Sequence, residues 1–412
     1  MRSRPDSDQT VRKASLLGLA ACGTIALTAW AAGAQESPEK HVEEARRTAE
    51  RAAATESALA RIEHPEEASE ESESPDTMQP TALSALGRGF GPANVSPLPE
   101  DWTEAGLDLS KAERTGDKLV QTLPSGLQVE FTVDPTVQSH MEEVLDDYSV
   151  PHGGVALVEP DTGRVLALVS HTEQSPKMPN LARKAAAPSA STFKIVTAAA
   201  LLETAGINPD AKTCYHGGAS HLTKSNIKGD PDRDHRCKDL GDALAWSINS
   251  IIAKLAYKHL DREDLQTWAK RFGYNTEIPF ELDIEQSTAE IVEDPFEQAR
   301  TAAGFWHTYL SPLHGALMSA AVENGGLMMR PSIIEKVTTP DGKVLKSFDK
   351  KVLRRVMSED TAKTLAKLLQ RTTDKGTARK YFGYRGAFPN DVTSGGKTGT
   401  LANHRPYLSF TW

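Results

Sequence analysis

Three short motifs combine hydroxyl, amine and amide side chains in a way that suits acyl transfer. Ser191 precedes Lys194 by three residues, Ser247 precedes Asn249 by two, and Lys397–Thr400 reads Lys-Thr-Gly-Thr. Together these motifs supply a nucleophile, two candidate amine bases, a proton relay and an anion-binding strand. Each motif is weak alone, and their occurrence in one chain is what predicts a site.

The first motif is expected at the start of a buried helix. Pro188 interrupts the preceding chain, Ser189 suits the N-cap position, and a helix is predicted from Ser191 to Thr204. Lys194 would then share a face with Ser191. The following residues are nearly all apolar, so burial would favour a neutral amine that accepts the serine proton. A capping serine followed by a solvent-reaching lysine remains the alternative reading of this motif alone.

The second motif interrupts an apolar helical pattern. Ser247 and Asn249 lie within the predicted helical region 240–260, where polar side chains compete with the backbone for hydrogen bonds. A helix junction that points into a cleft would explain them. A simple bend in the helix is the other interpretation.

The third motif is expected on a strand that follows Gly395 and Gly396. A lysine, two threonine hydroxyls and a glycine that permits close approach suit an extended peptide and its terminal carboxylate. The alternative is an exposed turn. Thr398, Gly399 and Thr400 are assigned to substrate binding, and Lys397 is assigned to the catalytic residues as the second candidate amine.

From about Gly126 to its end, the chain resembles the transpeptidase domain of penicillin-binding proteins, whose signature combines these motifs. The resemblance implies Ser191 as nucleophile and Lys194 as base. It implies that Ser247 relays a proton to the leaving amine and that Asn249 holds a substrate amide and the lysine. The backbone amide of Thr400 would be the second donor to the oxyanion.

Other segments also look like the family, namely 272–274, 311–313, 324–326 and 376–378. Two segments depart from it. Gly304-Phe305-Trp306 stands where the family more often has a Gly-x-Gly sequence. The chain also stops at Trp412, whereas the family continues with another strand and a helix. We therefore expect a C-terminally truncated domain, which is either a fragment or compromised.

The implied activity is a peptidoglycan D,D-transpeptidase that needs no cofactor and no metal. Its expected ligands are stem peptides ending in D-Ala-D-Ala and β-lactam antibiotics, and a cell-wall synthesis complex is a further candidate partner. The short N-terminal part favours a monofunctional, class B-like enzyme. The alternatives are hydrolysis by a D,D-carboxypeptidase or β-lactamase, and a non-catalytic penicillin-binding sensor or scaffold.

The elements that must position the motifs form an α+β pattern. Strands are expected at 129–133, 155–158 and 165–169, and a second hairpin at 337–345. Helices are expected through Leu145 and, in the middle of the chain, over 191–204, 240–260, 262–272 and 311–324. The resemblance implies an antiparallel sheet covered by helices, with an all-helical lobe beside it and the site between them.

The N-terminus reads as a targeting or anchoring segment. Arg12 and Lys13 precede an uncharged run, 14–34, that is long enough to cross a bilayer as a helix with the rest of the chain outside. An uncleaved single-span anchor in the cytoplasmic membrane is favoured. Cleavage after Ala34 and lipidation at Cys22 are the alternatives.

The predicted domains are an anchor or signal segment at 1–35, an acidic stalk at 36–82, a short extension at 83–125 and the transpeptidase domain at 126–412. Between Glu36 and Pro80 there are 13 acidic and 5 basic residues, so most of the net charge of −9 lies in the stalk. The chain shows no basic stripe interleaved with aromatic residues, and we expect no nucleic-acid binding.

Cysteine usage agrees with export. Cys214 and Cys237 lie in one loop-rich stretch, and in an oxidising compartment they could form a disulfide. Nearby histidines raise the alternative of a metal site, but their spacing matches no standard zinc pattern. Two free thiols are the remaining alternative.

Overall fold

The computed structural model describes residues 24–30, 98–173, 178–219, 221–382, 392–402 and 406–411. The remaining N-terminal residues, which include the predicted cleavage and lipidation sites and the acidic stalk, lie outside the described part. The chain divides into one unit formed by 1–34 with 100–412 and a second formed by 35–99.

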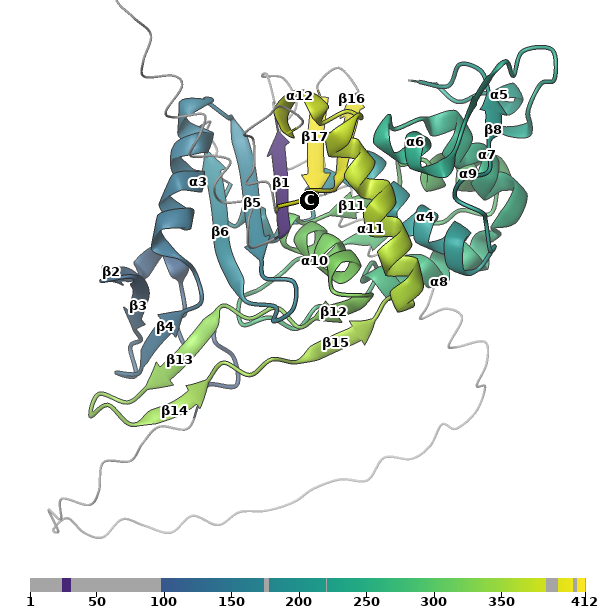
Figure 1. Cartoon of the computed structure of the whole chain (residues 1–412). Coiled ribbons are helices and arrows are strands. Elements are labelled where there is room, and N and C mark those ends of the chain that lie inside the picture. The colour runs from purple at the N-terminus through teal and green to yellow at the C-terminus, as the bar shows by residue number, and fades with distance from the viewer. Residues whose placement is uncertain are drawn as a thin grey trace, which may run out of the picture. The chain divides into compact units, whose positions relative to one another are not determined.

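A five-stranded antiparallel sheet forms the centre of the first unit (Figure 1). The hairpin predicted over 155–169 is present, because its two strands pair antiparallel, with one register shift next to Val158, around the turn that contains Gly163. The strand order is β16-β17-β1-β5-β6, so the strand with the third motif lies at one edge. The strands are β1 (Thr24–Trp30), β5 (His152–Val158), β6 (Val165–Thr172), β16 (Lys397–Ala402) and β17 (Pro406–Thr411).

The strand β1 corrects the prediction of a helix over the whole of 14–34. Thr24–Trp30 is extended and pairs antiparallel with β5 on one side and β17 on the other. An apolar run fits the middle of a sheet covered on both faces as well as it fits a membrane, so hydropathy alone could not separate the two. Within the described ranges, no helix is both long and apolar enough to span a bilayer.

Helices cover both faces of the sheet. The helix α3 (Pro135–Asp147) begins at Asp134, whose carboxylate accepts two backbone N–H groups, and it packs on the face that carries Val155 and Leu157. The helix α10 (Pro312–Glu323) lies on the other face, where Gly154 leaves no room for a β-carbon beside Pro312. The alternation of these side chains along β5 fixes which face each helix covers.

A mainly helical lobe, which also contains the two-stranded sheet β8-β9, lies beside the central sheet (Figure 1). The predicted helices at 191–204, 262–272 and 311–324 are present, whereas 240–260 is two helices separated near Ser247, which has a φ of 54°. The helices of the lobe are α4 (Lys194–Glu203), α5 (Lys224–Lys228), α6 (Leu240–Ala245), α7 (Asn249–His259), α8 (Arg262–Phe272) and α9 (Pro295–Ala302), and its strands are β8 (Thr213–Tyr215) and β9 (Arg236–Lys238).

The helix α11 (Glu359–Asp374) runs between the lobe and the sheet (Figure 1). A second five-stranded sheet has the order β14-β13-β4-β3-β2 and contains the predicted hairpin at 337–345. Its strands are β2 (Glu113–Thr115), β3 (Lys118–Thr122), β4 (Gln128–Phe131), β13 (Ile334–Thr338) and β14 (Val344–Ser347).

Short elements complete the described chain, and with them the α+β class predicted from the sequence is confirmed. The remaining strands are β7 (Ala187–Pro188), β10 (Thr288–Ala289), β11 (Thr308–Leu310), β12 (Leu327–Met329) and β15 (Val352–Arg355). The remaining helical turns are η2 (Leu109–Lys111), η3 (Leu181–Arg183), η4 (Ala190–Phe193) and α12 (Arg379–Phe382).

Candidate active site

Ser191 lies in the 3-10 turn η4, directly before α4. Ser189 occupies the N-cap position of η4, as the sequence predicted, but its side chain makes no capping hydrogen bond. Instead, the Ser189 hydroxyl accepts a hydrogen bond of 3.0 Å from the buried Tyr274 hydroxyl. This hydrogen bond attaches the turn η4 to the buried core, while Ser191 remains partly exposed to solvent.

The segment Ala303–Gly304 packs directly against the turn η4. Gly304 has a φ of 86°, and a β-carbon there would lie 2.2 Å from the carbonyl oxygen of Ala190. Only glycine fits this close approach without moving the turn that carries Ser191. In the sequence, Gly304-Phe305-Trp306 differs from the Gly-x-Gly sequence of the family, but the contact of Gly304 with η4 could not be predicted from the sequence.

Lys194 is fully buried, and its Nζ contacts three groups. It lies 2.6 Å from Ser191 Oγ, 2.7 Å from Asn249 Oδ1 and 2.5 Å from the carbonyl oxygen of Ala303. The last two groups are acceptors only. A neutral amine would therefore donate its two hydrogens to them, and its lone pair would accept the hydroxyl proton of Ser191.

The surroundings of Lys194 favour that neutral form. Burial lowers the pKa of Lys194 well below its usual value, and the charge on Lys397 lowers the pKa further. No hydrogen bond from Lys194 to a carboxylate opposes these two effects among the described residues. The geometry thus provides a base in contact with a nucleophile.

The second motif occupies the junction between α6 and α7. Ser247 adopts its left-handed conformation in the break, while Asn249 is the first residue of α7. This is the helix junction that the sequence suggested, and it places both side chains at the same site as Ser191. The two side chains have different partners, because Ser247 contacts Lys397 and Asn249 contacts Lys194.

Lys397 is the second fully buried amine of the site. Its Nζ donates to Ser247 Oγ at 2.9 Å and to the carbonyl oxygen of Thr398 at 2.6 Å. Burial lowers the pKa of Lys397 to about 7. At neutral pH this group can therefore be present both as a cation that attracts a carboxylate and as a neutral amine that exchanges a proton through Ser247.

The strand β16 carries the rest of the third motif. Among the described strands it pairs with β17 alone, and it also contacts η4. Gly399 is buried and Thr400 is exposed. An edge strand beside a nucleophile can accept an extended peptide by strand addition.

Thr377 joins the site, although sequence reasoning gave it no role. Its hydroxyl lies 2.7 Å from the Thr398 hydroxyl, and its backbone N–H donates to the carbonyl oxygen of Ala245 at 3.0 Å. The neighbouring Gly376 is needed there, since a β-carbon would lie 2.3 Å from the same oxygen. The only signal in the sequence was the resemblance of 376–378 to the family.

Cys214 and Cys237 are paired across β8 and β9 and joined by a disulfide. Both sulfur atoms are used in this bond, so neither remains as a thiolate ligand for a metal. Among the residues that the structure describes, no group of three or more His, Cys, Asp or Glu side chains is placed to hold a metal ion.

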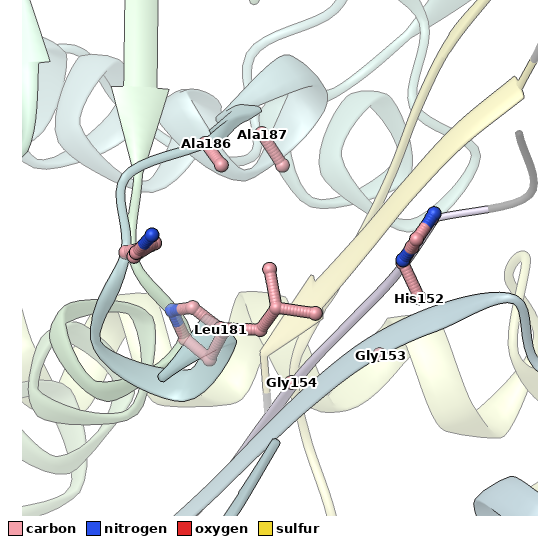
Figure 2. A pocket seen from close by; sticks show the side chains of 8 residues that line it. His152, Gly153, Gly154, Leu181, Ala186 and Ala187 are labelled. Carbon is pink, nitrogen blue, oxygen red and sulfur yellow. The ribbon is translucent and has the colours of Figure 1, made fainter. Parts of the chain in front are cut away.

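A small pocket of about 20 Å³ is shown in Figure 2. Its lining is largely apolar, and its volume suits about one water molecule. None of the predicted site residues lines it, so we assign it no part in the site. The lining residues are His152, Gly153, Gly154, Leu181, Lys184, Ala186, Ala187 and Pro312.

Comparison with known proteins identifies relatives of the same kind. A family model described as the penicillin binding protein transpeptidase domain matches residues 153–404. Peptidoglycan D,D-transpeptidase PbpA of Mycolicibacterium smegmatis is 28% identical over 288 residues, which cover 61% of this chain and 58% of the relative. Stage V sporulation protein D of Bacillus subtilis is 29% identical over 295 residues, covering 67% of this chain and 44% of the relative.

A solved structure has a similar fold. The imipenem acyl-enzyme complex of penicillin-binding protein A from M. tuberculosis aligns with a TM-score of 0.57 and 25% identity, covering 69% of this chain and 74% of that chain. The present chain spans less than two thirds of the length of either curated relative. Since the family model matches more than half of the chain, the protein belongs to the family of the penicillin-binding protein transpeptidase domain.

Proposed function

We propose that the protein is a serine D,D-transpeptidase that cross-links peptidoglycan stem peptides ending in D-Ala-D-Ala. The observation that carries this proposal is the arrangement around Lys194 Nζ, where two acceptors take its hydrogens and Ser191 Oγ lies 2.6 Å away. Relatives named as peptidoglycan D,D-transpeptidases support the substrate class.

In the first half-reaction, Lys194 takes the hydroxyl proton of Ser191 as Oγ attacks the carbonyl carbon of the penultimate D-Ala. The oxyanion that forms would accept hydrogen bonds from the backbone N–H groups of Ser191 and Thr400. The C–N bond then breaks, and the leaving D-Ala amine receives a proton through Ser247 from Lys397. The product is an ester between the stem peptide and Ser191.

In the second half-reaction, an amine from a neighbouring stem peptide attacks this ester. The new amide C–N bond forms as the ester C–O bond breaks, the proton of the amine passes through Ser247 to Lys397, and Lys194 returns its proton to Ser191 Oγ. Before acylation, Lys397 and the Thr398 hydroxyl would hold the terminal carboxylate of the donor peptide along β16, and this carboxylate departs with the released D-Ala. A β-lactam would acylate Ser191 by opening its ring amide, and its nitrogen would stay attached to the adduct.

The nucleophile can be tested with fluorescent penicillin. We expect covalent labelling of the wild type, none of Ser191→Ala, and normal labelling of Ser358→Ala. Ser358 caps α11 through its side chain, so this variant controls for loss of a serine hydroxyl elsewhere. Labelling of Ser191→Ala at the wild-type rate would refute the assignment.

The lifetime of the penicillin adduct, together with a reaction of D-Ala-D-Ala peptide donors, separates acyl transfer from hydrolysis and from ligand binding alone. A transpeptidase should form a long-lived penicillin adduct and should join D-Ala-D-Ala donors to an added amine. Rapid loss of the adduct to water would indicate a carboxypeptidase or β-lactamase. A stable adduct without release of D-Ala from peptide donors would indicate a sensor, and a scaffold would not be labelled.

We also propose that the protein is exported and that its catalytic domain functions outside the cytoplasmic membrane. Arg12 and Lys13 before the apolar run and the disulfide of the described domain support this location. In one molecule, Thr24–Trp30 cannot lie both in the sheet as β1 and in a bilayer. An intact chain that stays in the membrane fraction after alkaline washing would support the anchor, whereas an intact chain in the soluble fraction, with Thr24–Trp30 still attached, would overturn the anchor.

A further inference from the structure

The disulfide-closed segment 214–237 lies along the helix that begins with Asn249. Three side chains of α7 donate to backbone carbonyl oxygens of this segment. Asn249 Nδ2 donates to Ala219 at 2.6 Å, Ser250 Oγ to Gly217 at 3.2 Å, and Lys254 Nζ to Cys214 at 2.8 Å. The segment is thus attached to α7 at points that begin with the site residue itself.

The contact between the segment and α7 is close. Gly218 has a φ of 77°, and a β-carbon there would lie 2.8 Å from Ser250 Cβ. Ser250 is fully buried, and Asn249 is 8% exposed. A larger residue at position 218 would therefore push the segment away from the start of α7.

A network of charged and polar side chains around Asp234 connects the C-terminal part of the segment to His216 and to α7. Asp234 contacts His216 Nδ1 at 2.6 Å and Lys254 Nζ at 2.6 Å, and His216 Nε2 lies 3.2 Å from Ser225 Oγ. Burial alone would raise the pKa of Asp234, but hydrogen bonds from Lys254, the Asp230 N–H and His216 lower it to about 2. The connectivity is that of a Ser-His-Asp triad, but Lys254 neutralises Asp234, so we assign the set a structural role.

The orientation of the Asn249 amide links the segment to the chemistry. An amide can turn by half a rotation about its last bond, which exchanges its oxygen and nitrogen. The Ala219 carbonyl accepts only from nitrogen, so it holds Nδ2 on its own side and Oδ1 toward Lys194. In the reversed orientation, the nitrogen would face Lys194 Nζ, and the amine would lose one of its two acceptors.

We propose that the disulfide-closed segment 214–237 is a positioning element that orients Asn249 and, through it, the amine of Lys194. The proposal rests on the proposed function, in which Lys194 takes the proton of Ser191. The carbonyl group of Ala219 contacts Asn249 directly. The residues that hold the segment in place are Cys214, Cys237, Asp234 and Lys254.

Two variants loosen the segment by different routes. Cys214→Ala/Cys237→Ala removes the covalent closure, while Lys254→Met keeps the disulfide and removes the attachment to Cys214 and Asp234. Leu123→Ala is the matched control, because it removes a buried side chain near the second sheet and should lower stability without touching α7. Melting curves select a temperature at which all variants are folded.

We expect both loop variants to slow acylation by fluorescent penicillin about 10- to 100-fold, because a misplacement of about 1 Å in a catalytic group can cost about 100-fold in rate. The ascending part of their pH–rate profile should also move, since Lys194 loses a fixed acceptor. Leu123→Ala should keep the wild-type rate and profile. Wild-type rates in both folded loop variants, or an equal loss in Leu123→Ala, would overturn the proposal.

A second measurement does not depend on acylation. In a protein with ¹⁵N-labelled asparagine, we expect the side-chain NH₂ signals of Asn249 to shift or broaden in both loop variants and to stay unchanged in Leu123→Ala. If the wild type fails to label with penicillin, or if Ser191→Ala labels equally, the proposed function fails while these signals still report the positioning. Unchanged Asn249 signals in both loop variants would refute the positioning itself.

Discussion

At the scale of the residue, the unusual feature of the site is two fully buried lysines that interact electrostatically. Ammonium groups resist burial, so each site amine is shifted toward its neutral form. Their partners differ, because Lys194 contacts the nucleophile and Lys397 contacts the relay hydroxyl of Ser247. This difference gives each amine a separate expected effect on acylation.

Replacing Lys194 by methionine should remove the base and leave the apolar packing of α4 largely intact. General-base assistance contributes about 100- to 10,000-fold, so we expect a loss of acylation rate of that order. Stopped-flow fluorescence with labelled penicillin measures the rate, and a melting curve shows whether the variant is folded. A variant that is folded and acylates at the wild-type rate would contradict the base assignment.

The pH dependence of the acylation rate should report the protonation state of Lys397. Its cationic form would bind the carboxylate of the ligand, and its pKa is about 7, so the acylation rate at low ligand concentration should fall as the pH rises through about 7. Lys397→Arg keeps a positive charge at high pH, so the variant, although slower, should lack this decline. An identical decline in Lys397→Arg would assign it to another group.

At the scale of the element, close backbone approaches align the three motifs. Gly304 lies against the turn of Ser191, and Gly376 lies against the end of α6 just before Ser247. Glycine at both positions allows segments far apart in sequence to touch without side chains between them. The site is therefore held by main-chain contacts as much as by the motif side chains.

Gly304→Ala should displace the turn that carries Ser191, because the new β-carbon would lie 2.2 Å from the carbonyl oxygen of Ala190. Gly342→Ala is a matched control, since Gly342 has a φ of 87° and no atom within 4 Å of the β-carbon position. Both variants carry backbone strain of about 1–3 kcal/mol, measured by chemical unfolding. Only Gly304→Ala should also acylate at least about tenfold more slowly, and equal rates for the two variants would contradict this explanation.

At the scale of the whole molecule, the sequence predicted the α+β class, most of the larger elements of the described chain and the residues of the site. The motif residues carry reactive side chains, and amphipathic periods mark the elements around them, so both leave a trace in the sequence. The carbonyl of Ala303, the docking of 214–237 on α7 and the contact of Thr377 with Thr398 leave no such trace. They depend on groups that are far apart in sequence and are brought together only by the fold.

The stalk assigned to 36–82 remains a prediction about domain organisation. Its acidic composition and few large apolar residues suit a spacer, so an internal deletion of 36–82 should leave the acylation rate of the purified protein within about twofold of the wild type. A scrambled sequence of the same composition and length serves as the control. A large loss caused by the deletion, but not by scrambling, would show that spacer length matters for the domain itself.

The two interior amines also bear on how this protein could change under selection. Methionine or leucine at either position would remove an ammonium group from the interior and should raise resistance to heat, at the expense of reactivity. A library screened only for survival at high temperature is therefore expected to accumulate apolar residues at Lys194 and Lys397. Reactivity toward antibiotics would disappear from such a population before foldedness does.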